Sequence, residues 1–366
     1  MDRDEGRATA KTTLGRLGLP ERIPVRRTIL VILSIAIVIG VAAGSWATLS
    51  EGRLPGDAWR SFVVNGVARG SVYALIAMGY TLVYGILFMI NFAHGEVFMA
   101  GTFTSFFVAR AMADAGFLNE NPIIGIVILL LVSMAVSTSI AVLLERIAYR
   151  PLRGAPRLVP LITAIGASLF LQYTFRGLYG ARVRGYPQID AVSGRMELLG
   201  LSIERSELVV ILSAVALVIG LYFFIQRTKT GRSMRAVGED REIASLMGIN
   251  VDRVIVTTFA IGGMLAGAAG ILYVFLFPQV DFLMGFFPGI KAFTAAVLGG
   301  IGNVVGAAIG GLILGVLEAV GPTLFLSGAG VPSTHQLQPV MAFGVLVLVL
   351  IFRPGGILGS AEEKRA

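Results

Sequence analysis

Residues 289–321 read GIKAFTAAVLGGIGNVVGAAIGGLILGVLEAVG, and this stretch decides how the chain is organised. It belongs to an apolar region, Phe286–Phe325. That region is about twelve residues longer than the roughly 20 that one membrane-spanning helix requires. Its many glycines allow two interpretations, either one long tilted helix with small-residue packing or a segment that is broken in the middle. The rest of the chain decides between them.

The composition places the chain in a membrane. Of its 366 residues, 55% are hydrophobic and 14% are charged, against roughly 25% charged in an average globular protein. A soluble fold of this size could not bury so much apolar surface. The sequence has no cysteine and 2 histidines, which excludes disulfides and thiolate or multi-histidine metal sites. We therefore expect an integral membrane protein that holds no metal and no cofactor.

Apolar runs at regular intervals predict the membrane-spanning helices. The runs are Thr28–Leu49, Phe62–Phe88, Val97–Met112, Ile123–Leu144, Leu158–Tyr179, Leu208–Ile225, Val254–Phe277 and Gln338–Phe352. The predicted fold is therefore all-α, a polytopic membrane protein with about 8 transmembrane helices plus the glycine-rich re-entrant or broken segment.

Basic residues predict the orientation, because cytoplasmic loops carry an excess of lysine and arginine. They cluster in residues 1–27, 146–157 and 227–253 and again at the C-terminus, although residues 180–206 on the opposite side also carry arginines. We predict that both termini are cytoplasmic. An even number of crossings is then required, so the glycine-rich stretch returns to the face that it left. The net charge of +8 reflects these scattered loops and not nucleic-acid binding.

Four regions follow from this pattern. They are a basic cytoplasmic tail (1–27), an additional N-terminal transmembrane helix (28–49), the main transmembrane domain (61–359, with a cytoplasmic loop at 227–253) and a cytoplasmic tail (360–366). The first apolar run is also compatible with a cleaved signal peptide, since Arg26 and Arg27 precede it and small residues fill Ala42–Ala47. Its length favours a retained anchor.

No nucleotide-binding motif is present. The sequence has no P-loop, which would read Gly-x-x-x-x-Gly-Lys followed by Ser or Thr. The nearest glycine fingerprint, Gly300, Gly302 and Gly306, has the wrong spacing and follows no strand. If the protein moves a solute against a gradient, its energy comes from a partner or from an ion gradient.

Polar residues interrupt the apolar sequence between the second and third runs. Asn91, His94 and Glu96 lie there within NFAHGE. Ionisable groups near a membrane span usually mark a pathway or a tight turn, because lipid does not solvate them. Composition leaves two interpretations open. One is a substrate pathway, and the other is a turn at the cytoplasmic interface in which Asn91 caps a helix and His94 is solvated.

The connection Thr230–Asp252 predicts a short amphipathic helix. Asp240 would cap its start, and Gly248 would end it as a C-terminal glycine does. An apolar strip, Ile243, Leu246 and Met247, recurs at helical spacing. Such a helix lies either on lipid headgroups or in the groove of another protein, and its acidic start favours the protein groove.

Four separated motifs resemble the permeases of branched-chain amino acid ABC transporters, most closely their LivH-type subunit. The motifs are INFAHGEVFMAG (90–101), GRSMRAVGEDREIASLMGINVDRVI (231–255), KAFTAAVLGGIGNVVGAAIGGLILG (291–315) and FRPGGILG (352–359). The similarity extends from about Asn65 to Gly359. Residues 1–60 depart from it, since such permeases commonly begin near what is Phe62 here, so the additional span inherits no role.

The resemblance implies that the short cytoplasmic helix couples the permease to an ATPase. Glu242-Ile243-Ala244 and Gly248 match the Glu-Ala-Ala loop of ABC importers, with Ile243 replacing the middle alanine. In that family the helix sits in a cleft on the ATPase. The expected coupling residues are Asp240, Glu242, Ala244, Leu246, Met247 and Gly248.

The resemblance also implies partners and a mechanism. The expected partners are two ATP-binding subunits, a second related permease, an extracytoplasmic substrate-binding protein and membrane lipids, in a bacterial plasma membrane. The chain itself would be no enzyme and would work by alternating access. The candidate pathway residues are first Asn91, His94 and Glu96, and second Gly299, Gly300, Gly302 and Asn303, whose glycines could equally serve only close helix packing. Lys291 and Glu318 are interpreted as interfacial ends rather than a proton relay.

Other functions stay open. A urea or short-chain amide permease would share this scaffold and these motifs. An ion-coupled secondary transporter or a channel would need titratable groups deep in the spans, of which the sequence has few. A membrane scaffold without transport activity is the third alternative.

Overall fold

The computed structural model describes residues 25–50, 52, 55–156, 158–198, 201–327, 331, 334–353 and 355–359. Most of the predicted N-terminal tail (residues 1–24) and the whole C-terminal tail (360–366) lie outside the described residues. The chain divides into two compact units, Met1–Arg53 with Thr323–Pro332 and Leu54–Pro322 with Ser333–Ala366. The first unit contains helix α2 (Val25–Ser50), and the sites described below belong to the second.

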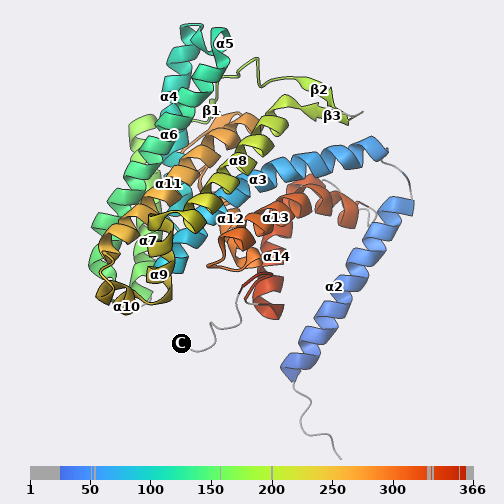
Figure 1. Ribbon diagram of the computed structural model, residues 1–366. Helices are drawn as coiled ribbons and strands as arrows, with labels where there is room; N and C mark the ends of the chain where they lie inside the picture. The colour runs from blue at the N-terminus through green and yellow to red at the C-terminus, as the bar shows by residue number, and fades with distance from the viewer. Residues whose placement is uncertain are drawn as a thin grey trace, which may run out of the picture. The chain divides into compact units, whose positions relative to one another are not determined.

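Helices dominate the second unit (Figure 1). They are α3 (Gly56–Leu87), α4 (His94–Asp114), α5 (Phe117–Glu120), α6 (Pro122–Leu144), the π-helix η2 (Glu145–Tyr149), the 3₁₀-helix η3 (Arg150–Leu152), α7 (Leu158–Tyr179), α8 (Arg205–Arg227), α9 (Lys229–Glu239), α10 (Arg241–Leu246), α11 (Val251–Leu276), α12 (Phe286–Gly299), α13 (Val304–Leu326), η4 (Thr334–Leu337) and α14 (Gln338–Phe352). Within the described residues, 6 helices are long and apolar enough to cross a membrane. The prediction of a polytopic α-helical membrane protein is confirmed.

The six spanning helices are α3, α6 with its continuation to Leu152, α7, α8, α11 and α13. Helix α4 covers the predicted run Val97–Met112 but is not among them, because Glu96 and Arg110 lower its hydropathy. Helices α7 and α14 begin and end at the residues predicted for them.

The glycine-rich stretch is broken, so the interpretation as one continuous helix is wrong. Helix α12 ends at Gly299 and α13 begins at Val304. Gly300 and Gly302 have φ angles of +107° and +95°, a left-handed conformation that only glycine adopts without strain. The 14 residues of α12 make a helix of about 21 Å, too short for a hydrocarbon core of about 30 Å.

Helices α3 and α11 form the centre of the unit, and α11 packs against α3, α4 and α6. Small residues make these contacts close. A Cβ on Gly263 would lie 2.8 Å from the Ser137 carbonyl oxygen of α6, and Ser133 Oγ donates a 2.7 Å hydrogen bond to the Gly267 carbonyl. Small-xxx-small spacing therefore serves helix packing, as it commonly does in membranes.

Two short antiparallel strand pairs occupy the connections, where the all-α prediction included no strands. Strand β1 (Arg184–Gly185) pairs with β4 (Gln279–Val280), and β2 (Arg195–Leu198) forms a hairpin with β3 (Leu201–Glu204). The hairpin leads directly into α8, whose first turn is closed by a capping box between Glu204 and Glu207.

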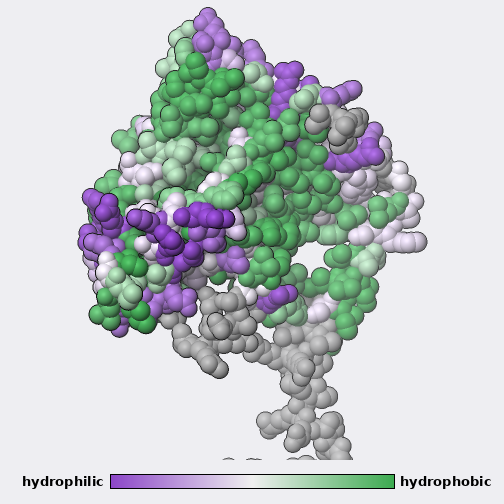
Figure 2. Space-filling model, viewed as in Figure 1, coloured by the Kyte–Doolittle hydropathy of each residue, from purple (hydrophilic) through white to green (hydrophobic). Residues whose placement is uncertain are grey.

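Hydrophobic and hydrophilic residues separate on the surface of this unit. Figure 2 shows a broad hydrophobic area along the helices, with hydrophilic residues gathered around α9 and α10 at one end and around α5 and β2–β3 at the other. Leu131 of α6 and Leu212 of α8 are exposed members of the apolar area. Apolar side chains exposed over the middle of spanning helices are suited to lipid.

Candidate functional site

Asn91, His94 and Glu96 form a buried cluster at the start of α4. Asn91 Oδ1 accepts hydrogen bonds from Tyr149 Oη at 2.6 Å and from the Ala93 backbone N–H at 3.1 Å. The second contact is an Asx turn, which directs the chain into α4. The first reaches the π-helix η2, whose irregular turn follows α6. Asn91 therefore ties the start of α4 to the end of α6.

His94 is buried, which contradicts the alternative in which it is solvated. Its ring lies against Gly79 of α3 and Gly262 of α11, and its centroid is 4.7 Å from that of Tyr80. The imidazole fits there because neither glycine carries a side chain. Its Nε2 atom is buried and has no hydrogen-bond partner among the described residues.

Glu96 connects α4 to α7. Its Oε1 accepts hydrogen bonds from Gln172 Nε2 at 2.6 Å and from Ser168 Oγ at 3.2 Å, whereas Oε2 is buried without a hydrogen-bond partner among the described residues. The buried cluster thus joins α3, α4, α6, α7 and α11. Nothing in its geometry opens it to a cavity, so its three residues are placed to position helices and not to contact a solute.

A cavity of about 510 Å³, here called the inner cavity, lies beside the break between α12 and α13. Its wall comes from the last turns of α3, the end of α8, one face of α9, the break itself and the C-terminal segment. The lining residues are Thr81, Leu82, Tyr84, Gly85, Ile86, Phe88, Tyr222, Ile225, Gln226, Met234, Arg235, Gly238, Glu239, Ile301, Gly302, Asn303, Val304, Val305, Leu358 and Gly359. The wall is mostly apolar and aromatic with a few polar groups, which suits a small solute with an apolar part.

The four residues predicted at the break divide into two roles. Gly302 and Asn303 line the inner cavity. Gly299 and Gly300 instead allow close backbone packing, since a Cβ on Gly299 would meet the Gly306 carbonyl and one on Gly300 would meet Gly359. The structure therefore separates two glycines that pack from one that faces the cavity.

The C-terminal motif FRPGGILG docks onto this break. The backbone N–H groups of Ile357 and Leu358 donate hydrogen bonds to the carbonyls of Leu298 at 2.8 Å and Gly299 at 3.0 Å. Asn303 holds both sides, because its Nδ2 donates to the Leu358 carbonyl at 3.0 Å and its Oδ1 accepts from Gly306 N–H at 2.9 Å. Two motifs that are separate in the sequence thus form one wall of the inner cavity.

Lys291 and Glu318 are not interfacial ends, as the sequence suggested. Their side chains are 13% and 1% exposed and form an ion pair with each other, and Lys291 Nζ also lies 3.4 Å from Tyr73 Oη. The break brings them together: α13 folds back on α12, so that Gly310 packs on Ala295 and Glu318 reaches Lys291. A buried charge survives in an apolar surrounding only when it is paired.

The short helix α10 is capped at both ends as predicted. Asp240 Oδ1 accepts hydrogen bonds from the backbone N–H groups of Glu242 at 2.8 Å and Ile243 at 2.9 Å. Gly248, at φ +81°, closes the other end, where its N–H donates to Ser245 and the next N–H to Ala244, the pattern of a Schellman motif. The fold of this helix is therefore encoded locally.

The apolar strip of α10 faces outward. Ile243, Leu246 and Met247 are 59%, 87% and 78% exposed, whereas Ala244 on the other side is buried. Exposed apolar side chains on a rigid, capped helix are characteristic of a docking surface. This strip is called the α10 surface below.

Two arginines fasten α9 and α10 to the ends of the spanning helices. Arg241 Nε donates to the Ile86 carbonyl of α3 at 3.0 Å, and Arg235 Nη1 donates to the Ile225 carbonyl of α8 at 2.6 Å. Burial, together with the nearby Arg153 guanidinium, holds the pKa of Arg241 below its usual value. The α10 surface is thus fixed to the helices that line the inner cavity.

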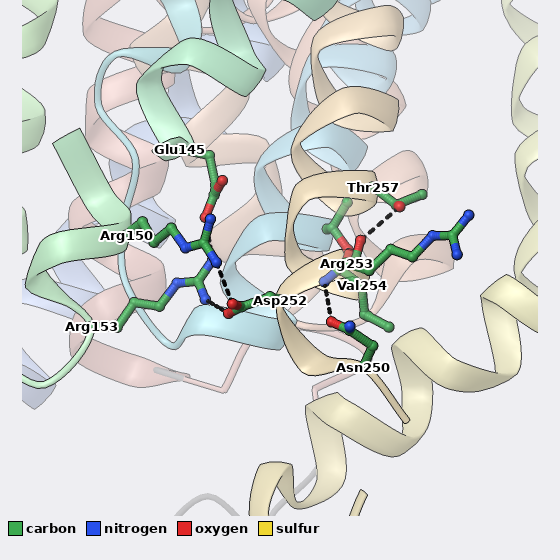
Figure 3. A network of polar contacts seen from close by, with 9 residues as sticks. Glu145, Arg150, Arg153, Asn250, Asp252, Arg253, Val254 and Thr257 are labelled. Atoms are coloured by element: carbon green, nitrogen blue, oxygen red, sulfur yellow. Dashed lines mark hydrogen bonds and ion pairs between the residues drawn. The ribbon is translucent and has the colours of Figure 1, made fainter. Parts of the chain in front are cut away.

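An ionic network joins the end of α6 to the start of α11 (Figure 3). Arg150 and Arg153 both pair with Asp252, and Arg153 also pairs with Glu145, whose side chain is fully buried. Beside it, Asn250 Oδ1 caps α11 by accepting from Arg253 N–H at 2.9 Å. Since Asp252 follows α10 by only a few residues, this network fixes the C-terminal side of the α10 surface.

Comparison with known proteins agrees with this organisation. Residues 62–350 match the family described as the branched-chain amino acid transport system permease component. The chain belongs to this permease family. It is 42% identical over 306 residues to the high-affinity branched-chain amino acid transport system permease protein BraD of Pseudomonas aeruginosa, covering 83% of this chain and 96% of that protein. It is 44% identical over 308 residues to the LivH permease protein of the corresponding system of Escherichia coli, covering 82% and 96%. No solved structure matches the chain.

Membership of the permease family confirms the resemblance drawn from the four motifs. As in its relatives, the chain is a membrane permease component and is not itself catalytic. The matched region begins at residue 62, so α2 precedes it.

Sequence reasoning missed the ionic network of this permease. Arg150 and Arg153 were interpreted only as orientation charges, and Asp252 was not singled out. The sequence held one signal, namely that Glu145 is the single acid in a basic loop directly after an apolar run. Its pairing with Arg153, and the link to Asp252 about one hundred residues away, depend on how α6 and α11 pack.

Proposed function

We propose that this permease is the membrane subunit of an ATP-driven importer of branched-chain amino acids, coupled to its ATPase through the α10 surface. The observation that carries the proposal is the geometry of α10. The helix presents three exposed apolar side chains on a scaffold capped by Asp240 and Gly248. It is bonded directly to the helices that line the inner cavity.

The coupling step is mechanical. When two ATPase subunits close on ATP, a helix seated in a cleft on one of them moves with that subunit. Arg241 carries the movement of α10 to the end of α3, and Arg235 carries that of α9 to the end of α8. The network around Asp252 carries it to α6 and α11. Because helices are stiff, displacement of these ends changes access to the inner cavity.

The energy source is a partner protein, since the sequence has no P-loop. The proposed complex contains two ATP-binding subunits, a second related permease and an extracytoplasmic binding protein that delivers the solute. The excess of basic residues in the loop that contains α9 and α10 supports a cytoplasmic position for it in a bacterial plasma membrane, with both chain termini on the same side.

The inner cavity is the proposed route for the solute on the α10 side. Gly302 and Asn303 face it, and Tyr84, Phe88 and Ile225 supply the apolar contacts that a branched side chain needs. Asn91, His94 and Glu96 position the surrounding helices. The role proposed for them is to hold the pathway in shape, and not to bind the solute.

Uptake into proteoliposomes tests the function. The complete transporter is reconstituted with its binding protein outside and ATP or a non-hydrolysable analogue inside. We expect radiolabelled L-leucine to accumulate only with ATP and to be displaced by L-isoleucine and L-valine but not by urea. Uptake driven by an ion gradient without ATP would refute the proposal, and uptake of urea in preference to leucine would assign the amide alternative.

A further inference from the structure

A second cavity, here called the outer cavity, lies at the end of α8 that is remote from α9. Its volume is about 370 Å³, near the lower limit of the roughly 300–1,000 Å³ found for small-molecule pockets. Six polar side chains on its wall carry the argument. They are Asn65 and Arg69 of α3, Arg195 and Glu204 of the β2–β3 hairpin, Glu207 of α8 and Gln338 of α14.

Glu207 supplies a buried negative charge on this wall. It is 7% exposed, and its Oε1 accepts a 3.0 Å hydrogen bond from Asn65 Nδ2. Its Oε2 accepts from the Glu204 backbone N–H at 3.3 Å. Both donors are neutral, and within the described residues no cationic side chain forms an ion pair with Glu207. A carboxylate removed from water without a cation is costly, so the cavity favours a ligand that brings one.

Arg69 supplies the opposite charge. Its Nη1 donates a 3.1 Å hydrogen bond to Gln338 Oε1, a neutral acceptor, and its guanidinium lies 5.1 Å from the centre of the Phe277 ring. Its Nε is buried and has no hydrogen-bond partner among the described residues. No carboxylate in the described part of the chain pairs with it. The guanidinium is held in place yet keeps donor capacity for an anion.

The two charges face the same cavity from neighbouring positions. Asn65, which binds Glu207, lies one helical turn before Arg69 on α3, a spacing of about 6 Å between Cβ atoms. Arg195 and Glu204, which are opposite each other in the β2–β3 hairpin, repeat the same mixed charge in exposed positions at the rim. The wall therefore carries one anion and one cation that neutralise neither each other nor a third group.

We propose that the outer cavity binds the α-amino and α-carboxylate groups of a free amino acid, the carboxylate on Arg69 and the ammonium on Glu207. This rests on the proposed function and deepens it. A simple anion would be repelled by Glu207 and a simple cation by Arg69. Neutral urea would leave both charges unsatisfied. Only a small zwitterion matches both groups, so the cavity recognises what all α-amino acids share and leaves side-chain selectivity to the binding protein.

Equilibrium binding to the complete transporter in lipid nanodiscs, without the binding protein, tests the assignment. The probe is radiolabelled L-leucine, and the competitors are L-alanine, isovalerate (no ammonium), isoamylamine (no carboxylate) and urea. We expect only L-alanine to displace leucine. Arg69→Gln and Glu207→Gln should each weaken leucine binding about 10- to 100-fold, because each removes one charge-assisted contact.

Two further variants control for folding and for general charge effects. Arg60→Gln removes an exposed arginine two turns earlier on α3 and should leave binding unchanged. Arg69→Lys keeps the positive charge and should restore part of the affinity lost in Arg69→Gln, which a folding defect would not allow. Thermal unfolding of each complex confirms that the helices still assemble.

The results separate this site from the function on which it rests. If the wild-type complex imports leucine with ATP while Arg69→Gln and Glu207→Gln bind and import it normally, the site is wrong and the function stands. If both variants bind leucine normally and lose only stimulation of the ATPase by the binding protein, the cavity is a docking contact and the site is wrong. If the wild type binds and imports no leucine at all, the proposed function itself fails.

Discussion

The α10 surface makes a prediction that separates coupling from folding. Leu246 is 87% exposed, so replacing it with alanine removes almost no contact within the permease itself. Ala244, on the other side of the same helix, is buried. Leu246→Ala should therefore weaken assembly with the ATPase and leave the fold intact, whereas Ala244→Leu should do the reverse and destabilise the permease.

The size of each effect follows from burial. Truncating leucine to alanine removes the side chain beyond Cβ, worth about 2.4 kcal/mol at about 0.8 kcal/mol per methylene on full burial. Since Leu246 is 87% exposed in the free chain, about 2 kcal/mol of this is available to a docking partner, or about 30-fold in affinity. Overpacking at Ala244 should cost about 1–3 kcal/mol of folding stability.

The assay measures both quantities on the same samples. Titration of nanodisc-embedded permease with the purified ATPase gives the affinity, and thermal unfolding in the same lipid gives the stability. Leu212→Ala is the matched control, because Leu212 is also an exposed leucine but lies on the apolar face of α8. If Leu246→Ala binds the ATPase as tightly as Leu212→Ala does, α10 is not the docking helix and the coupling proposal is wrong.

Three further predictions concern the break between α12 and α13. Gly300→Ala should lower the unfolding temperature, by a change of about 2 kcal/mol or more, because Gly300 combines a φ of +107° with contact to the C-terminal segment. Gly344→Ala, in open space on a regular helix, should not lower it. Lys291→Met should destabilise the permease by about 3–5 kcal/mol, and adding Glu318→Leu should restore most of the loss, as a double-mutant thermal series would show. Gly311→Leu should abolish ATP-driven uptake, measured in proteoliposomes, because its side chain would collide with the α3 backbone.

Features encoded in neighbouring residues could be predicted from the sequence. The ends of α7 and α14 coincide with the ends of apolar runs. The caps of α10 at Asp240 and Gly248 were predictable because a capping side chain bonds backbone groups two or three residues away. The break at Gly300 was one of two interpretations, and the need for an even number of crossings favoured it.

Features that depend on packing between distant helices could not be predicted. His94 is buried because Gly79 and Gly262, on two other helices, leave room for its ring. Lys291 and Glu318 looked like interfacial charges because the sequence does not show that the break turns α13 back onto α12. The broken-helix interpretation did hold a usable signal, since a hairpin at Gly300 places these two residues opposite each other.

The same helices line both cavities, and this limits how a solute can pass. Helix α3 contributes Arg69 to the outer cavity and Thr81 to the inner one, α8 contributes residues at its two ends, and α13 contributes Ala319 and Val304. Between the cavities, glycines press the α3 and α13 backbones together, so that a Cβ on Gly70 would lie 2.8 Å from the Gly311 carbonyl oxygen. A solute that crosses must therefore part this seam, and the helices that part are the ones whose far ends carry α9, α10 and the break.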